Sequence, residues 1–494
     1  MSGLLVTGTS SDAGKSLVVT GLCRALARRG VRVAPFKAQN MSNHSMVCRD
    51  GTEIGRAQYL QAQAAGLEAT SAMNPVLLKP GSDRRAHVVL RGRPAGELRA
   101  GEYATGRTHL AEAAFAAYAE LESQVDLVVC EGAGSPAEIN LRAGDYVNLG
   151  LARRFDLPTI LVGDIDRGGV LAALYGTWAL VDDADRAMLR GYVINKFRGD
   201  ADILAPGLAE ITARTGMPSF GVLPWLTDVW LDSEDALSVG AWGSAGTGSG
   251  TDDGSDESSR LLVAVVRLPR TSNATDVDAL AAEPGVDVRV TRDSALVREA
   301  DLVVLPGSRA TVSDLQWLRS TGLAAAVTDR HRRGAPVLGI CGGYQMLLSE
   351  IVDDVEQDGG ASGPVAGLDL LPGRVVFGPE KVLARPRGTW RGHPVEGYEI
   401  HHGVVSPAGG EQVPGGHRVG STTGTIWHGT LECDDFRRAL LTEVAASTGS
   451  SWTPCRDAPP FARRREGMID ALADALEAHV DVDGILDLTT KGRA

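Results

Sequence analysis

The sequence predicts an α/β protein made of two doubly wound domains, and three observations lead to this prediction. Short, continuous apolar runs alternate with stretches of helical pattern, as in parallel sheets that are covered on both faces. The alternation stops in the stretch 241–259, which is rich in Gly, Ser and Asp, and then starts again. The length of 494 residues also exceeds what one hydrophobic core normally spans.

The predicted boundaries follow from where these runs begin and end. The first domain is expected over residues 1–236, a flexible linker over 237–260, the second domain over 261–448 and a C-terminal extension without motifs over 449–494. Strands of the first domain are expected in LLVTG (4–8), VRVAPFK (31–37), VDLVVCEGAG (125–134), LPTILVGDID (157–166), LRGYVINKF (189–197) and MPSFGVLP (217–224). Strands of the second domain are expected in RLLVAVVRLP (260–269), VDVRV (286–290), ADLVVLPGSR (300–309) and APVLGICGGYQML (335–347).

Charge and composition narrow the classes of function. The net charge of −13 argues against binding to nucleic acid or to an anionic membrane surface, and it favours small-molecule substrates. The first residues do not have the pattern of a signal peptide, and there is no uninterrupted apolar run of about 18 residues. The six cysteines lack C-x-x-C spacing, which favours reduced thiols. We therefore expect a cytoplasmic protein.

The stretch GTSSDAGKS, residues 8–16, has the context of a phosphate loop, because it follows an apolar strand and opens a helical pattern. In the usual pattern G-x-x-x-x-G-K-[ST] the first glycine would stand at Thr9, but the glycine is one residue earlier. Taken alone, the stretch is either a nucleotide site or a structural turn. For the first alternative the candidate nucleotide-binding residues are Gly8, Thr9, Gly14, Lys15 and Ser16.

Polar residues at the ends of other predicted strands favour the nucleotide site, since ligands of open α/β sheets bind at the carboxyl ends of the strands. Lys37, Asn195 and Lys196 are candidate nucleotide-binding residues. Ser16, Glu131 and Asp164 are candidate ligands of Mg²⁺, which prefers oxygen. The alternative for each single residue is that strand ends are polar simply because they reach the surface.

A second candidate site lies in APVLGICGGYQML, which has the form strand, tight turn, helix, with Cys341 at the turn. A nucleophile on such an elbow is presented at the edge of the sheet, where the N-terminus of the following helix favours the thiolate. The N–H groups of Gly342 and of Gly307, in the glycine turn VLPGSRAT, are candidate donors to an oxyanion.

The cysteine needs a base, and the second half contains five histidines. These are His393, His401, His402, His417 and His428. His428 ends the strand-like run in GTIWHGTLECDDF, whereas His401 and His402 lie in GYEIHHG. Periodicity alone does not decide between them.

Two resemblances resolve several of these alternatives. The loop GTSSDAGKS resembles the phosphate loop of dethiobiotin synthetase-like enzymes, in which five residues separate the first glycine from Gly-Lys-Ser/Thr. Motifs along almost the whole chain resemble the cobyric acid synthase family: VAPFKAQNMSNHS, CEGAGSPAEINL, VGDIDRGGV, VINKFRGD, LPGSRATVSDLQWLR, GICGGYQML, GYEIHHG and WHG. This resemblance implies an N-terminal P-loop, dethiobiotin synthetase-like domain and a C-terminal, flavodoxin-like class I glutamine amidotransferase domain.

The resemblance also implies roles. Cys341 is then the glutaminase nucleophile and His428 its base, while the usual third member in His-x-Glu is missing, because residue 430 is Thr and Glu432 is too far along the chain. The sequence departs from the family in IWHG, where Tyr-Leu-His-Gly is more common, and at His402, where Met is usual. The histidine assignment therefore stays worth testing.

The implied activity is ATP- and Mg²⁺-dependent amidation, with ammonia from glutamine, of the b, d, e and g carboxylates of adenosylcobyrinic acid a,c-diamide in cobalamin biosynthesis. The expected partners are thus a corrinoid, glutamine and ATP. One alternative is the related cobyrinic acid a,c-diamide synthase, from which PFKAQNMS and EGAGSPAEINL distinguish this sequence. A partition-type ATPase is an alternative from another class, and it leaves Cys341 and the second half unexplained.

Overall fold

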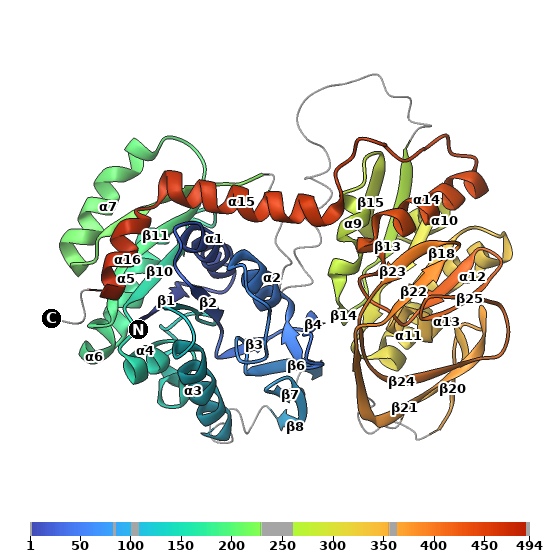
Figure 1. Ribbon diagram of the computed structural model, residues 1–494, viewed down its shortest axis with the longest axis horizontal. Helices are drawn as coiled ribbons and strands as arrows, with labels where there is room; N and C mark the ends of the chain where they lie inside the picture. Colours follow the sequence, from blue (N-terminus) through green and yellow to red (C-terminus); the bar gives the residue numbers. More distant parts are fainter. Residues whose placement is uncertain are drawn as a thin grey trace. The chain divides into compact units, whose positions relative to one another are not determined.

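The computed structural model describes residues 2–82, 85–99, 108–227, 229, 260–353, 355 and 363–490. The chain divides into two compact units (Figure 1). The first unit contains Met1–Ser42, Cys48–Asp232 and Arg465–Ala494, and the second contains Asn43–Val47 and Ser233–Arg464. Both units are α/β, with a central sheet that is parallel in the first unit and mainly parallel in the second, so the predicted fold class is confirmed. Apart from residue 260, the predicted linker 237–260 lies outside the described residues.

A six-stranded parallel sheet forms the centre of the first unit, in the order β12-β11-β10-β1-β9-β2. Its strands are β1 (Ser2–Gly8), β2 (Val33–Phe36), β9 (Leu127–Glu131), β10 (Thr159–Asp164), β11 (Leu189–Phe197) and β12 (Ser219–Pro224). Five of the six predicted runs contain one of these strands, and the run 4–8 is part of the longer β1. Because all six strands point the same way, their carboxyl ends meet at one edge of the sheet.

Helices connect these strands and pack against them. They are α1 (Lys15–Arg28), α2 (Arg56–Ala64), α3 (Thr108–Glu122), α4 (Leu149–Phe155), α5 (Val170–Leu180), α6 (Asp183–Arg186) and α7 (Ala201–Thr215). Helix α1 packs on β1, β2 and β9 through a continuous apolar face that includes Val18, Leu22 and Leu26. The helix thereby starts directly above the carboxyl end of β1.

The first unit also contains a small mixed sheet that the sequence analysis did not predict. Its strands, in the order β3-β6-β7-β8, are β3 (Gln39–Met41), β6 (Val76–Ser82), β7 (Arg85–Leu90) and β8 (Arg93–Arg99). Strand β3 pairs in parallel with β6, and the other pairs are antiparallel. A short strand β5 (Glu53–Gly55) and a 3-10 helix η2 (Ile139–Gly144) complete the regular structure that is described here.

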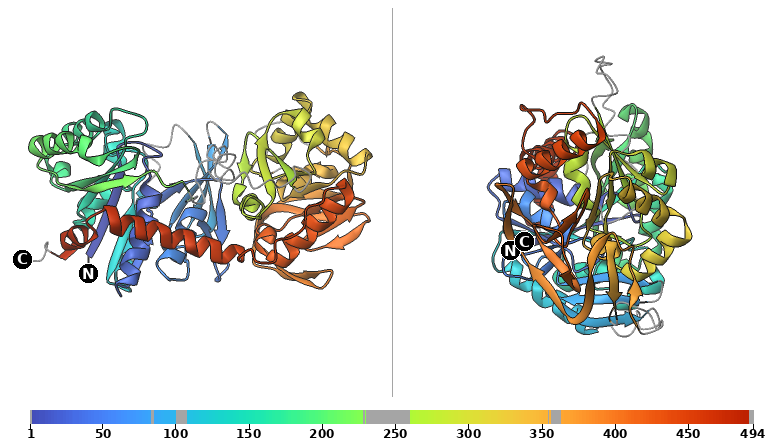
Figure 2. Two further views of the ribbon diagram at one scale, coloured as in Figure 1. Left: turned by 90° about the horizontal axis from the view of Figure 1, so that it is seen from above. Right: turned by 90° about the vertical axis from the view of Figure 1, so that its right-hand side faces the viewer.

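The C-terminal extension is divided between the units: residues up to Arg464 belong to the second unit, and those from Arg465 on pack on the core of the first. From Arg465 on, α15 (Phe461–His479) lies alongside α1, and α16 (Val482–Thr490) follows it (Figures 1 and 2). Ile469 and Leu476 are wholly buried in the same apolar core as α1. A Cβ on Gly21 would lie 2.0 Å from Leu476 Cδ1, so glycine is needed where the two helices meet. On the rim, Arg28 forms an ion pair with Asp470 at 2.8 Å.

A seven-stranded sheet forms the centre of the second unit, in the order β15-β13-β16-β18-β27-β26-β25. Its strands are β13 (Leu261–Val266), β15 (Val286–Thr291), β16 (Leu302–Leu305), β18 (Val337–Ile340), β25 (Glu411–Val413), β26 (Gly416–Val419) and β27 (Thr422–Thr425). The first five strands in the sheet order are parallel, and the last two pair antiparallel. All four strands expected in this half are present.

Smaller elements surround this sheet. A second sheet, in the order β20-β19-β21-β24, contains β19 (Leu348–Val352), β20 (Val365–Ala366), β21 (Leu371–Ala384) and β24 (Glu399–Pro407). There are also two strand pairs. One joins β14 (Thr271–Ser272) to β17 (Gly307–Ser308), and the other joins β22 (Arg387–Trp390) to β23 (His393–Glu396). The helices are η5 (Ala274–Val277), α9 (Asp278–Ala281), α10 (Ser294–Glu299), α11 (Thr311–Ser320), α12 (Leu323–Arg332), α13 (Gly342–Leu347), η6 (Thr430–Glu432) and α14 (Asp434–Thr448). Strand β4 (Ser45–Val47) also belongs to this unit. Over the described residues of both units, no helix combines the length and apolarity needed to span a bilayer.

Candidate active sites

The phosphate loop connects β1 to α1, and its backbone is held from two neighbouring strands. Thr9 N donates to Val162 O on β10 at 3.0 Å. Asn195 Nδ2, near the end of β11, donates to Ala13 O at 3.0 Å. Gly14 has a left-handed φ of 97°, and a Cβ there would lie 1.9 Å from Asn195 Nδ2. Only glycine therefore fits at this position.

The side chain of Lys15 lies over this loop. Its Nζ donates to Ser10 O at 2.9 Å and to Gly134 O at 3.2 Å. A Cβ on Gly8 would lie 3.1 Å from Lys15 Nζ, so a side chain at position 8 would crowd the ammonium group. The first glycine of the longer loop thus makes room for the lysine.

A buried carboxylate lies next to the start of α1. Glu131, the last residue of β9, accepts hydrogen bonds from Ser16 Oγ (2.8 Å), Lys37 Nζ (2.8 Å) and Gln61 Nε2 (2.5 Å). Burial by itself raises the pKa of Glu131, but the charge of Lys37 and these hydrogen bonds outweigh burial and lower the pKa. The structure therefore brings together Ser16, Lys37 and Glu131, which the sequence analysis named separately.

The remaining predicted residues of this edge form a second group. Lys196 Nζ donates to Asp164 Oδ2 and to Asp12 O, both at 2.7 Å. Asp164 Oδ1 accepts from the backbone N–H of Asp166 at 2.9 Å. Asp164 thus faces an ammonium group, whereas Glu131 faces both a hydroxyl and an ammonium group.

Cys341 lies on a sharp turn between β18 and α13, as predicted from the sequence. Its φ of 49° and ψ of −108° are unusual for a residue with a side chain. The turn is fixed on both sides, because Cys341 N donates to Thr425 O at 2.8 Å and Cys341 O accepts from Gln345 N at 2.9 Å. This geometry turns the thiol away from the direction of the strand.

Gly342 and Gly307 lie where their backbones must approach other groups closely. A Cβ on Gly342 would lie 2.6 Å from Ser308 N, and a Cβ on Gly307 would lie 3.1 Å from His428 Cε1. The two candidate oxyanion residues are therefore linked through Ser308, and one of them borders the ring of His428.

His428 is wholly buried, and its ring contacts two functional groups. Nδ1 donates to Asp276 Oδ2 at 2.7 Å, and the N–H of Gly429 donates to Asp276 Oδ1 at 2.8 Å. The ring also interacts with Cys341. Burial lowers the pKa of His428, but Asp276 and Cys341 outweigh it and raise this pKa to about 10. Tyr398 stacks on the ring with centroids 5.3 Å apart.

Comparisons with known proteins agree with this arrangement. Residues 4–239 match the CobQ/CobB/MinD/ParA nucleotide binding domain, and residues 262–435 match the CobB/CobQ-like glutamine amidotransferase domain. The chain is 64% identical over 489 residues to the cobyric acid synthase of Cutibacterium acnes. This match covers 99% of the present chain and 100% of the relative. It is 54% identical over 500 residues to the cobyric acid synthase of Mycolicibacterium gilvum, at 100% and 97% coverage. The chain belongs to the cobyric acid synthase family.

As a member of the cobyric acid synthase family, the chain is a glutamine-dependent amidoligase, with its nucleotide-binding domain before its amidotransferase domain. The alternative of a partition-type ATPase does not account for the amidotransferase domain, which contains Cys341.

The other histidines of this cobyric acid synthase family member have different neighbours. His401 Nε2 lies 3.5 Å from Glu399 Oε2, His402 Nδ1 lies 3.2 Å from Gly378 O, and His417 Nδ1 lies 2.6 Å from Tyr344 OH. His428 interacts with Cys341, whereas these contacts of His401, His402 and His417 are with other groups. The structure therefore favours His428 over the two alternatives in GYEIHHG.

Sequence reasoning missed Asp276, because 152 residues separate it from His428. The missing His-x-Glu position directed attention to residues just after His428, where Thr430 and Glu432 lie. One signal was present: the polar segment with Asp276 follows the carboxyl end of β13, where ligands of parallel sheets bind.

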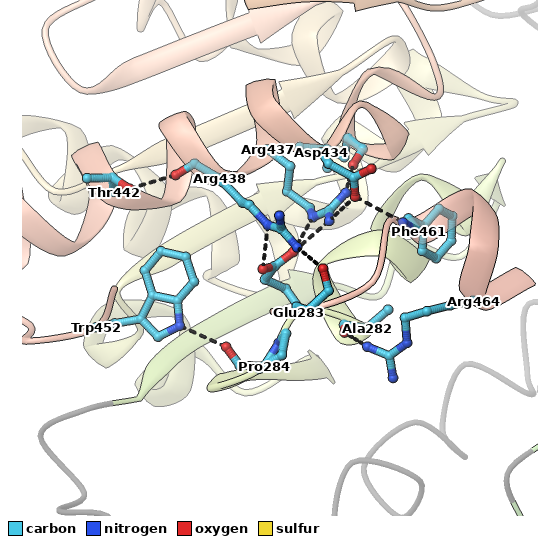
Figure 3. Close-up of polar contacts among 12 residues, drawn as sticks. Ala282, Glu283, Pro284, Asp434, Arg437, Arg438, Thr442, Trp452, Phe461 and Arg464 are labelled. Atoms are coloured by element: carbon cyan, nitrogen blue, oxygen red, sulfur yellow. Dashed lines mark hydrogen bonds and ion pairs between the residues drawn. The ribbon is translucent and has the colours of Figure 1, made fainter. Parts of the chain in front are cut away.

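A polar cluster around Glu283 joins the residues that follow α9 to the first turns of α14 (Figure 3). Glu283 Oε2 accepts from Arg437 Nε (2.9 Å) and Nη2 (2.6 Å), and Glu283 Oε1 accepts from Arg438 Nε (2.9 Å). Glu283 and Arg437 are buried, and both bonds from Arg437 are charge-assisted. The cluster thus ties the end of α9 to α14.

Proposed function

We propose that the chain catalyses the ATP- and glutamine-dependent amidation of the b, d, e and g carboxylates of adenosylcobyrinic acid a,c-diamide, a reaction of cobalamin biosynthesis. One observation carries the proposal: a single chain holds both the Cys341–His428–Asp276 arrangement and a phosphate loop with Lys15 beside a buried Lys37–Glu131 pair. The first arrangement suits release of ammonia, and the second suits activation of a carboxylate. Full-length similarity to curated cobyric acid synthases supports the choice of substrate.

In the second unit, the Cys341 thiolate attacks the side-chain amide carbon of glutamine. The N–H groups of Gly307 and Gly342 are assigned to stabilise the developing oxyanion. The C–N bond then breaks, and His428 donates a proton to the departing ammonia. Asp276 holds His428 with Nδ1 protonated, so Nε2 faces the reaction. Water finally hydrolyses the thioester and releases glutamate.

In the first unit, the task is to convert a carboxylate, which is a poor electrophile, into an acyl phosphate. The loop backbone and Lys15 are assigned to the phosphates of ATP, where the ammonium offsets the negative charge of the transferred group. Thr9, Asn195 and Lys196 support the loop and its edge. Ammonia then displaces phosphate from the activated carboxylate.

Ser16 and Glu131 fit a magnesium site, because a hydroxyl and a carboxylate oxygen lie 2.8 Å apart at the phosphate loop. Asp164 is the third candidate, and its carboxylate pairs with Lys196 as that of Glu131 pairs with Lys37. In the part of the chain that the structure describes, no group of three or more His, Cys, Asp or Glu side chains is arranged for a metal. Mg²⁺ normally keeps waters and substrate phosphates as ligands, so two protein ligands suffice. When bound, Mg²⁺ neutralises phosphate charge.

We also propose a cytoplasmic location. All six cysteines are free thiols, and four of them are buried. Cys23 and Cys130 lie in the core, where burial raises the pKa of each thiol. Such thiols are typical of proteins from reducing compartments.

The substrate assignment predicts a specific product. With ATP, Mg²⁺ and glutamine, adenosylcobyrinic acid a,c-diamide is expected to gain four amides, each of which exchanges a hydroxyl for an amino group. Mass spectrometry follows the four successive decreases in mass. Cobyrinic acid without the a and c amides is expected to be a poor substrate. Amidation at a and c would instead identify the related a,c-diamide synthase activity.

The role of Asp276 predicts a matched pair of variants. Asp276→Asn is expected to lower kcat for glutamine hydrolysis by about a hundredfold or more, because the imidazole loses the carboxylate that orients it. The pKa of His428 falls in this variant, since Asp276 raises it, so the alkaline limb of the rate profile is expected to move to lower pH. Synthesis with free ammonia is expected to continue.

Glu399→Gln is the control, because it removes the carboxylate next to His401. Glutaminase rates and pH profiles are measured for both variants. A larger loss in Glu399→Gln than in Asp276→Asn would contradict the assignment of His428 as the base.

A further inference from the structure

The motif NMSNHS, residues 40–45, has no role in the chemistry above, although it lies only a few residues after Lys37 in the sequence. The segment Asn43–Val47 belongs to the second unit, while the residues on both sides of it belong to the first. A piece of the N-terminal half of the sequence is therefore built into the amidotransferase unit.

This segment is hydrogen-bonded to the turn that precedes Asp276. The N–H of Ser45 donates to Asn273 Oδ1 at 2.9 Å, and Nδ1 of His44 accepts from the N–H of Ala274 at 3.3 Å. His44 and Ser45 are both buried, at 3% and 0% exposure, as is Asn273 at 3%. Because Nδ1 of His44 accepts, it carries no proton in this contact.

The turn at Asn273 begins the 3-10 helix that carries Asp276. Asn273 has φ 48° and ψ 47°, a left-handed conformation that asparagine tolerates better than most residues with side chains. It opens η5, in which Asp276 N donates to Asn273 O at 3.0 Å. Because of this hydrogen bond, a change in the position of Asn273 is expected to move Asp276, three residues later, whose carboxylate contacts His428.

We propose that His44 and Asn273 are positioning residues of the glutaminase: the segment Asn43–Val47 fixes the turn at Asn273 and so holds Asp276 against His428. This inference rests on the proposed roles of Cys341 and His428. It makes ammonia release depend on a segment from the ATP-dependent half of the sequence, and it gives the motif NMSNHS a function in the reaction of the other half.

The test uses the full-length protein and three variants. His44→Ala removes the acceptor, and His44→Asn restores one, because the Oδ1 of Asn lies where Nδ1 of His accepts. Asn273→Gly keeps the left-handed turn but removes the acceptor for Ser45. The matched control is His331→Ala, which removes a histidine of the same unit whose Nδ1 contacts Thr422 Oγ1 at 2.8 Å.

His44→Ala and Asn273→Gly are expected to lower kcat for glutamine hydrolysis by about tenfold, which corresponds to one buried hydrogen bond. KM for glutamine is expected to stay within about twofold, because neither residue is assigned to the substrate. Synthesis with free ammonia is expected to be unchanged, and His44→Asn is expected to recover most of the glutaminase rate. His331→Ala is expected to behave like the unaltered protein in both assays.

The inference is overturned if His44→Ala hydrolyses glutamine normally, if His44→Asn is as impaired as His44→Ala, or if the ammonia-dependent rate falls by the same factor. Failure of the proposed function itself gives a different pattern, in which Cys341→Ser retains its glutaminase activity. The thermal unfolding temperature of Asn273→Gly, in which glycine can adopt the left-handed turn, shows whether a lower rate comes from a loss of folded protein.

Discussion

Cys341→Ser is expected to abolish glutamine-dependent synthesis and to leave ammonia-dependent synthesis in place. The serine hydroxyl is a far weaker nucleophile than a cysteine sulfur beside His428, so glutamine hydrolysis is expected to fall by about a thousandfold or more. The ATP site uses whatever ammonia reaches it. High ammonium at mildly alkaline pH, where more of it is free base, should therefore bypass the lesion.

His428→Ala is expected to copy this pattern, because the thiol then loses the base that contacts it and the group that protonates the leaving ammonia. His401→Ala and His402→Ala are the matched controls, since both remove a histidine from β24. Their effects on glutamine hydrolysis are expected to be small. Near-normal glutaminase activity in His428→Ala, together with its loss in either control, would show that the base is assigned wrongly.

Lys15→Ala is expected to have the opposite pattern, with both glutamine-dependent and ammonia-dependent synthesis lost while glutamine hydrolysis continues. Lys15 is the ammonium group held over the phosphate loop, at 2.9 Å from Ser10 O. Without it, charge on the transferred phosphoryl group is not offset, and a loss of roughly a thousandfold in synthesis is expected. Synthesis and hydrolysis are measured on the same preparation.

Folding of Lys15→Ala is checked by thermal unfolding, because Lys15 is buried and its hydrogen bonds also hold the loop. Retained amidation with ATP and free ammonia would remove Lys15 from the mechanism. The reciprocal patterns of Lys15→Ala and Cys341→Ser separate the two reactions within one chain.

Local patterns were sufficient for much of the fold and for several site residues. The apolar runs predicted all six strands of the first central sheet, since strands buried on both faces must be continuously apolar. The phosphate loop and the elbow at Cys341 were also predicted, because each lies within a few consecutive residues. The antiparallel strands of the mixed sheet were missed, as short half-exposed strands such as β7 and β8 leave a weaker pattern.

The sequence alone thus determined the fold class, the family and a candidate nucleophile, because strand burial, backbone turns and short motifs are encoded by neighbouring residues. Only the tertiary structure brought Asp276 to His428, placed His44 on the turn before Asp276, and buried the C-terminal extension against α1. These contacts join residues that are far apart in the chain. A single sequence carries no local spacing for such pairs, since their distance depends on how the strands are ordered in the sheets and on which helices pack together.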